Sequence, residues 1–180
     1  MYIIIIQFVI FVLACRVPVT RVTALIHTHA MEKINVLYVD DEANNHEVFK
    51  GYFRRHYNVF TADSADKARI ILSAREIHVL ITDQKMPVTV GTQLLEEAIQ
   101  AYPQQTRILL TAYAENEAIL DAFQRGLIFK YVIKPYEPEK LKEIIDGAYQ
   151  VYQLKQIKEQ LYREWVKTQE ELNLLRLKTK

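Results

Sequence analysis

The sequence predicts an α/β fold, namely a doubly wound five-stranded parallel sheet with a long C-terminal helical extension. Two observations lead to this prediction. Short apolar runs alternate with segments of helical spacing, and the runs are apolar almost throughout instead of alternating with polar residues. Strands of this kind are buried on both faces, as in a parallel sheet covered by helices on either side. The functional crevice of such a sheet lies at the carboxyl ends of its strands.

The five expected strands are short runs of β-branched and apolar residues. They are residues 34–39, 57–62, 78–82, 106–112 and 128–133. The expected helices carry apolar residues at intervals of three and four. They are residues 44–56, 64–76, 91–102, 115–126 and a long helix after Pro138. Ser64 is the expected N-cap of the second helix, because its hydroxyl can accept a hydrogen bond from a free amide of the first turn.

The composition is that of a globular domain with appendages. The chain has 180 residues, 50% of them hydrophobic and 25% charged. Its 23 basic and 22 acidic residues leave a net charge of +1, so we expect no nucleic-acid or membrane partner. The single cysteine, Cys15, excludes a disulfide within the chain and fits a reducing, cytoplasmic location.

The first 30 residues differ from the rest. Of the 14 residues Tyr2–Cys15, 13 are apolar, but a membrane-spanning helix needs about 20, and no basic residue precedes the run as in a signal peptide. We prefer the interpretation that translation starts at Met31, with a membrane anchor as the alternative. The expected division is residues 1–30 as an apolar segment and linker, 31–148 as the domain and 149–180 as a helical, coiled-coil extension.

Polar residues follow four of the expected strands. They are Asp40, Asp41 and Glu42 after the first, Asp83 after the third, Thr111 in the fourth and Lys134 after the fifth. Each alone is a common turn or capping residue. Together they should meet at one edge of the sheet, where crowded carboxylates call for a cation and hard oxygen ligands favour Mg²⁺. A lysine and a hydroxyl at the same place suit a phosphoryl group.

Four motifs then carry a family resemblance: VLYVDDE, LITDQKMP, ILLTAYA and YVIKPY. They resemble the receiver domain of bacterial two-component response regulators, over about Met31 to Gln150, and imply its flavodoxin-like fold. The implied roles are Asp83 as phosphoacceptor; Asp41, Asp83 and the backbone carbonyl of Lys85 as Mg²⁺ ligands, with Asp40 assisting; Lys134 as the cation that contacts the phosphoryl group; Thr111 and Tyr131 as the switch pair; and a cis Lys134–Pro135 bond.

Three positions near these motifs bear on the chemistry. Lys85, two residues after the acceptor, brings a cationic side chain close to the site, and Tyr113 is bulky; both are expected to tune the lifetime of the acyl phosphate. Gly91 is expected to allow a tight approach of the helix that it begins.

The C-terminal segment contains neither Gly nor Pro from Tyr149 to Lys180, so the last helix should continue through it. Seven of ten heptad positions are apolar; the ten are Ile144, Gly147, Val151, Leu154, Lys158, Leu161, Trp165, Thr168, Leu172 and Leu175. We expect a parallel homodimer through this seam, whose leucines and tryptophan would be solvent-exposed in a monomer. A solvated helix packed on its own domain is the alternative.

The favoured function is a stand-alone receiver that accepts a phosphoryl group on Asp83 from a sensor histidine kinase or phosphotransfer protein and signals through a conformational switch. The alternative is a phosphorelay intermediate that passes the group to a histidine phosphotransfer partner. Such a protein is no ordinary enzyme, although it catalyses its own phosphorylation and dephosphorylation. A Mg²⁺-dependent phosphatase is disfavoured because Lys85 stands where that chemistry needs a second acid.

Overall fold

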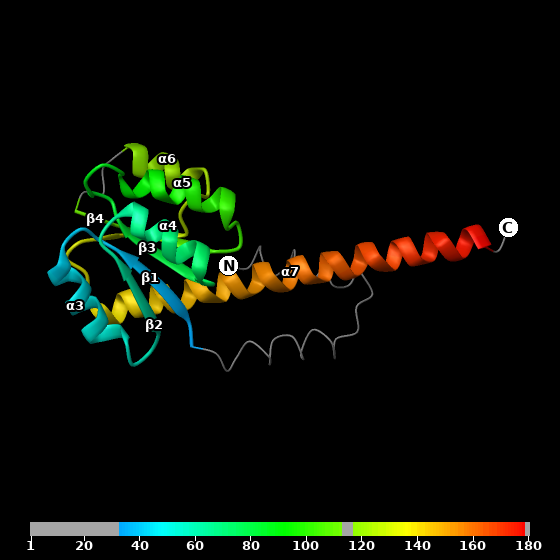
Figure 1. Cartoon of the computed structure of the whole chain (residues 1–180), viewed down its shortest axis with the longest axis horizontal. Helices are drawn as coiled ribbons and strands as arrows, with labels where there is room; N and C mark the ends of the chain where they lie inside the picture. Colours follow the sequence, from blue (N-terminus) through cyan, green and yellow to red (C-terminus); the bar gives the residue numbers. More distant parts are fainter. Residues whose placement is uncertain (1–32, 113–116, 179–180) are drawn as a thin grey trace. The chain divides into compact units, whose positions relative to one another are not determined.

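A computed structural model describes residues 33–112 and 117–178 of the chain. The centre of the domain is a five-stranded parallel sheet in the order β2-β1-β3-β4-β5 (Figure 1). Its strands are β1 (Asn35–Val39), β2 (Asn58–Ala62), β3 (Val79–Asp83), β4 (Thr106–Thr111) and β5 (Lys130–Ile133). The predicted sheet is confirmed, because the apolar runs pair in the centre of the sheet and are buried on both faces.

Helices cover both faces of the sheet. They are α3 (Ala43–Phe53), α4 (Ala65–Ala74), α5 (Gly91–Ala101), α6 (Glu117–Gln124) and α7 (Pro138–Lys178). One hydrophobic cluster joins the sheet to α4, α5 and α6, and a second joins it to α3 and the first turns of α7 (Figure 1). These two apolar layers make the doubly wound fold that the sequence predicts.

The register of the strands brings their carboxyl ends to one edge. Val39 is level with Thr82, and Asp83 is level with Leu110. Thr111 in turn is level with Ile133, the last residue of β5. Asp40, Asp83, Thr111 and Lys134 therefore reach the same edge of the sheet although they are far apart in the chain.

Local features agree with the sequence in most places. The hydroxyl of Ser64 accepts a hydrogen bond from the amide of Lys67, so the predicted N-cap of α4 is confirmed. Helix α6 ends at Gln124, two residues before the predicted end at Gly126, which has a positive φ of 70° that glycine adopts readily. Gly126 thus lies just beyond the helix instead of within it.

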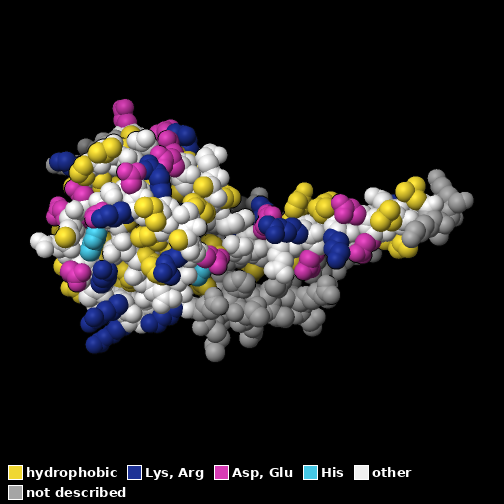
Figure 2. Space-filling view, viewed as in Figure 1, with side chains coloured by type: hydrophobic (Ala, Val, Ile, Leu, Met, Phe, Trp, Pro, Cys, Tyr) yellow, Lys and Arg dark blue, Asp and Glu magenta, His cyan; other side chains and the backbone are white. Residues whose placement is uncertain are grey.

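Helix α7 continues for 41 residues without a break, about 60 Å at 1.5 Å per residue. The compact unit of the described chain is Lys33–Tyr152, and Gln153–Lys178 continue the helix. Along this second part, hydrophobic side chains are interspersed with charged ones (Figure 2). The long helical extension is confirmed, as the absence of Gly and Pro predicts.

The exposure of the heptad seam differs in part from the expectation. Trp165, Leu172 and Leu175 are exposed by 40, 43 and 59%. Leu161, however, is fully buried within a single chain, and Leu154 is partly buried. The expectation of a seam exposed along its whole length is therefore wrong at Leu161. The exposed part of the seam begins one turn later.

The apolar N-terminal segment, the proposed start at Met31 and Tyr113 all lie outside the residues that the structure describes. Within residues 33–112 and 117–178, no helix is long and apolar enough to cross a membrane.

Candidate functional site

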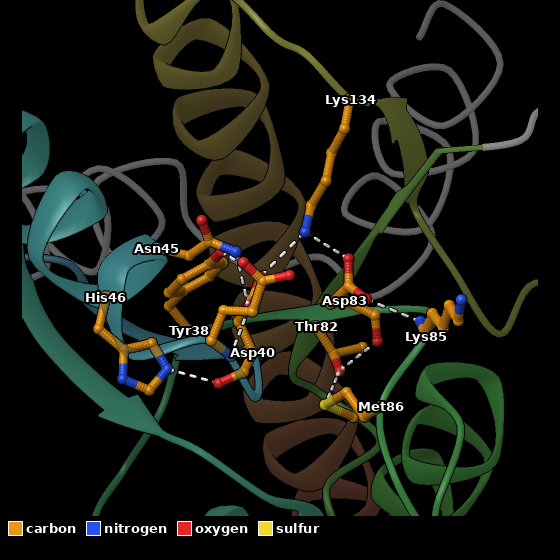
Figure 3. Close-up of polar contacts among 10 residues, drawn as sticks. Tyr38, Asp40, Asn45, His46, Thr82, Asp83, Lys85, Met86 and Lys134 are labelled. Atoms are coloured by element: carbon orange, nitrogen blue, oxygen red, sulfur yellow. Dashed lines mark hydrogen bonds and ion pairs between the residues drawn. The ribbon is translucent and has the colours of Figure 1, made fainter.

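The site is built around Asp83, the last residue of β3. Asp83 is only 7% exposed, because the neighbouring strands β1 and β4 extend to either side of it. The ammonium group of Lys134, which follows β5, lies between two carboxylates (Figure 3). Lys134 Nζ is 2.5 Å from Asp83 Oδ1 and 2.9 Å from Asp40 Oδ2. Three of the predicted residues therefore meet in one ionic cluster.

Asp40 follows β1 and is 1% exposed. Its Oδ1 accepts hydrogen bonds from the backbone amide of Glu42 at 3.0 Å and from Asn45 Nδ2 at 2.9 Å. Its Oδ2 accepts from the hydroxyl of Tyr38 at 2.6 Å and from Lys134 Nζ at 2.9 Å. Burial raises the pKa of Asp40, but these bonds outweigh burial and hold the pKa below its ordinary value. Asp40 is therefore a stable buried anion.

The charge state of Lys134 follows from the same contacts. Burial lowers its pKa, yet hydrogen bonds to Asp83 and Asp40 and the charges of both carboxylates more than offset burial, so the pKa lies above its ordinary value. The cluster thus holds two carboxylates against one fixed cation. The Lys134–Pro135 peptide bond is cis, which confirms the prediction.

Hydrogen bonds and close packing fix the backbone around Asp83. Asp83 Oδ2 accepts a hydrogen bond of 2.7 Å from the amide of Lys85 (Figure 3). The amide of Gly91 donates to the carbonyl of Gln84 at 3.0 Å, which draws the start of α5 against the end of β3. A Cβ atom on Gly91 would lie 2.3 Å from the carbonyl oxygen of Asp83. The tight approach expected at Gly91 is therefore an approach to the backbone of Asp83 itself.

The predicted switch residues lie on the two neighbouring strands. Thr111 ends β4 and is 3% exposed, and its carbonyl accepts the amide of Lys134 at 2.7 Å. Tyr131 in β5 is level with Leu109, so it lies two residues before the level of Thr111. Its ring is half-buried and meets that of Phe123 from α6 edge to face, with centroids 6.1 Å apart. Tyr131 therefore connects β5, the strand that precedes Lys134, to helix α6.

Asp41 does not join the cluster. It is exposed, and within residues 33–112 and 117–178 no group of three or more His, Cys, Asp or Glu side chains is close enough to hold a metal ion. We expected three crowded carboxylates around a cation. The structure brings two of them, Asp40 and Asp83, together on the ammonium of Lys134, the cation expected at the same edge.

Sequence reasoning missed two residues of this site. Tyr38 and Asn45 both donate to Asp40. A signal for Tyr38 was present, since residues two apart on a strand share a face and a buried tyrosine needs a partner for its hydroxyl. Asn45 had no comparable signal, because its contact depends on how α3 leaves the end of β1.

The fold and the ionic cluster at its carboxyl edge place the chain in the flavodoxin-like class of α/β domains. A family model described as the response regulator receiver domain matches residues 36–146. The chain belongs to this family, and the resemblance seen in the four sequence motifs is confirmed.

Individual relatives agree. The chain is 29% identical over 119 residues to the hydrogenase transcriptional regulatory protein HoxA of Bradyrhizobium diazoefficiens, spanning 66% of this chain but 24% of that protein. It is 29% identical over 120 residues to a chemotaxis protein CheY homolog of Campylobacter jejuni, spanning 64% of this chain and 92% of that one. The crystal structure of the response regulator TrrA from Thermotoga maritima, a complex with Mg²⁺ and BeF, has a TM-score of 0.58 at 27% identity and covers 64% of this chain and 98% of that chain.

Proposed function

We propose that Asp83 accepts a phosphoryl group and that this chain is a signalling receiver. One observation carries the proposal, namely the ammonium of Lys134 held by Asp40 within 2.5 Å of Asp83 Oδ1. A fixed cation beside a carboxylate nucleophile is what a group with two negative charges needs on arrival. Membership of the receiver family supports the same role.

In the proposed step a carboxylate oxygen of Asp83 attacks the phosphorus of a phosphohistidine on a sensor kinase or phosphotransfer protein. A P–O bond to Asp83 forms as the P–N bond breaks, and the released imidazole takes up a proton from water. Lys134 neutralises an oxygen of the transferred group, and the amide of Lys85 already donates to Asp83. Hydrolysis by water returns the carboxylate and inorganic phosphate.

Mg²⁺ is the proposed cofactor. The oxygen donors fit it, because the carboxylates of Asp83 and Asp41 and the backbone carbonyl of Lys85 are hard ligands at the carboxyl ends of the neighbouring strands β1 and β3. Asp41 is exposed, so its side chain has room to turn toward the site. A bound Mg²⁺ would offset the negative charge of the incoming group. The Mg²⁺ and BeF complex of TrrA supports this assignment.

The proposed switch couples Asp83 to the surface of α6 and β5. A phosphoryl oxygen on Asp83 would attract the hydroxyl of Thr111, and the half-buried ring of Tyr131 would then repack against Thr111 and Phe123. Exposed apolar side chains flank this region: Leu120 and Phe123 on α6 and Ile133 on β5 are exposed by 43, 45 and 48%. Their contacts with a protein partner would change when Tyr131 moves.

The second part of the proposed output is a homodimer through α7. Trp165, Leu172 and Leu175 occupy heptad positions and are exposed. Burying each against a second copy would contribute about 1.5 to 3 kcal/mol. The surrounding Glu, Lys, Arg and Gln residues are those of a coiled coil in water.

A direct experiment tests the phosphoacceptor. A small acyl phosphate and Mg²⁺ should add one phosphoryl group to the protein, seen by intact-mass spectrometry. Asp83→Asn should abolish this addition, because the amide is a poor nucleophile, whereas Asp121→Asn, at an exposed aspartate on α6, should leave it unchanged. Undiminished labelling of the Asp83→Asn variant would refute the assignment.

A further inference from the structure

Tyr38 lies in β1, two residues before Asp40, and is 1% exposed. Its ring stacks on that of Phe49 from α3, with centroids 4.2 Å apart and planes within 5° of parallel. This packing fixes the ring, so the hydroxyl can reach only a limited region. There it donates to Asp40 Oδ2 at 2.6 Å, a short hydrogen bond to a charged acceptor (Figure 3).

Asp40 has no acceptor position left. Each of its two oxygens accepts two hydrogen bonds, from Glu42 and Asn45 at Oδ1 and from Tyr38 and Lys134 at Oδ2. A carboxylate offers about four such positions. The arrangement therefore makes Asp40 an anchor for Lys134 and leaves direct metal ligation to other oxygens.

We infer that Tyr38 is a positioning residue for phosphoryl transfer to Asp83, acting through Asp40 on Lys134. The inference rests on the proposed function of Asp83. Tyr38 and Lys134 share the same oxygen, Asp40 Oδ2. By donating to it, Tyr38 both fixes its place and withdraws part of its charge, so the ammonium is not drawn wholly to Asp40 and stays against Asp83 Oδ1 at 2.5 Å.

Loss of the hydroxyl has a definite consequence. In Tyr38→Phe the ring and its stacking on Phe49 remain, but Asp40 Oδ2 has Lys134 as its one remaining donor. The ammonium is then held more strongly by Asp40 and less by Asp83, where the incoming group needs it. Loss of a hydrogen bond to a charged group should therefore lower the rate of labelling of Asp83 by about tenfold.

The chain offers a matched control. Tyr57 is also buried, at 3% exposure, and also donates to an aspartate, Asp146 Oδ1, at 2.8 Å. That bond joins the region after α3 to helix α7 and has no contact with Lys134 or Asp83. Tyr57→Phe therefore removes the same kind of buried hydrogen bond without touching the ionic cluster.

The experiment compares the wild type, Tyr38→Phe and Tyr57→Phe. Urea unfolding should show that both variants fold and lose stability. At saturating acyl phosphate and Mg²⁺, the rate of labelling should fall about tenfold in Tyr38→Phe alone, with little change in the half-saturating Mg²⁺ concentration. In metal-free protein, the NMR signals of the Lys134 side chain should shift in Tyr38→Phe and stay in place in Tyr57→Phe.

The outcomes separate this inference from the proposed function. If the wild type is labelled at Asp83 and the two variants have equal rates and unshifted Lys134 signals, Tyr38 is structural only and the inference fails. If Asp83→Asn is labelled as well as the wild type, the proposed function fails first. A large rise in the half-saturating Mg²⁺ concentration for Tyr38→Phe would place Asp40 among the direct metal ligands and overturn the anchor role.

Discussion

Replacing Gly91 by alanine should damage both the stability and the chemistry of the domain. An added Cβ would lie 2.3 Å from the carbonyl oxygen and 3.0 Å from the carbonyl carbon of Asp83, and 2.9 Å from Leu109 Cδ1. Leu109 is a flexible side chain that can move, but the backbone of Asp83 is part of β3. The clash is therefore relieved only if α5 or the end of β3 shifts.

The cost can be estimated from overpacking of protein cores, which destabilises by about 1 to 3 kcal/mol. For a domain of this size, that corresponds to a fall in Tm of roughly 4 to 12 °C. The displacement also acts on the acceptor, because a shift of about 1 Å in a reacting group can reduce a rate about a hundredfold. Labelling of Asp83 should therefore slow by more than the loss of folded protein explains.

Gly51→Ala is the matched control. Gly51 lies within α3, is exposed, and a Cβ there would meet nothing within 4 Å. The substitution should stabilise the helix by about 0.5 to 1 kcal/mol and leave labelling unchanged. Urea unfolding and the rate of labelling by an acyl phosphate check both variants. If Gly91→Ala matches the wild type in both stability and labelling rate, the conclusion that α5 packs too closely against Asp83 to admit a Cβ atom is refuted.

Two further predictions concern other parts of the chain. Burial, the hydrogen bond to Asp146 and its negative charge raise the pKa of the Tyr57 hydroxyl from 10.0. The folded state therefore keeps this proton more tightly than the unfolded state, so its contribution to stability is complete below pH 10 and is lost as pH rises further. Urea unfolding between pH 8 and about 11 should show a fall that Tyr57→Phe makes shallower; an equal slope in both proteins would contradict the assignment. In the tail, light scattering should show a dimer for the wild type and a monomer for Leu172→Glu with Leu175→Glu, still labelled at Asp83, because these side chains are exposed in the single chain. A wild-type monomer at tens of micromolar would leave the solvated helix as the better interpretation.

Much of the site could be predicted from the sequence, because its residues lie at the ends of strands. Asp83 and Thr111 close apolar runs that can only be central strands, and Lys134 follows the last run directly. In a parallel sheet the carboxyl ends share one edge, so the convergence of these residues follows from the pattern alone. The long helix could also be predicted, since the chain contains no Gly or Pro after Tyr149 that would end it.

The side-chain contacts within the site could not be predicted from the sequence. Lys134 and Asp40 are 94 residues apart, and their distance depends on the register of β1, β3, β4 and β5 and on the path of the chain after β5. The sequence predicted a third carboxylate, Asp41, in the cluster, whereas the structure leaves it exposed. Which of two adjacent aspartates turns inward is decided by where the chain leaves β1, which no local pattern encodes.

By itself, the sequence determined which strands end in polar residues, the doubly wound class of the fold and the continuous last helix. These features follow from local patterns of hydrophobic burial and backbone hydrogen bonding. Only the tertiary structure decided that Tyr38 and Asn45 saturate Asp40, that Gly91 packs against the carbonyl of Asp83, and that Leu161 is buried while Leu172 is not. Each of these depends on distances of a few ångströms that no local sequence pattern specifies, and such distances are fixed only when the whole core is packed.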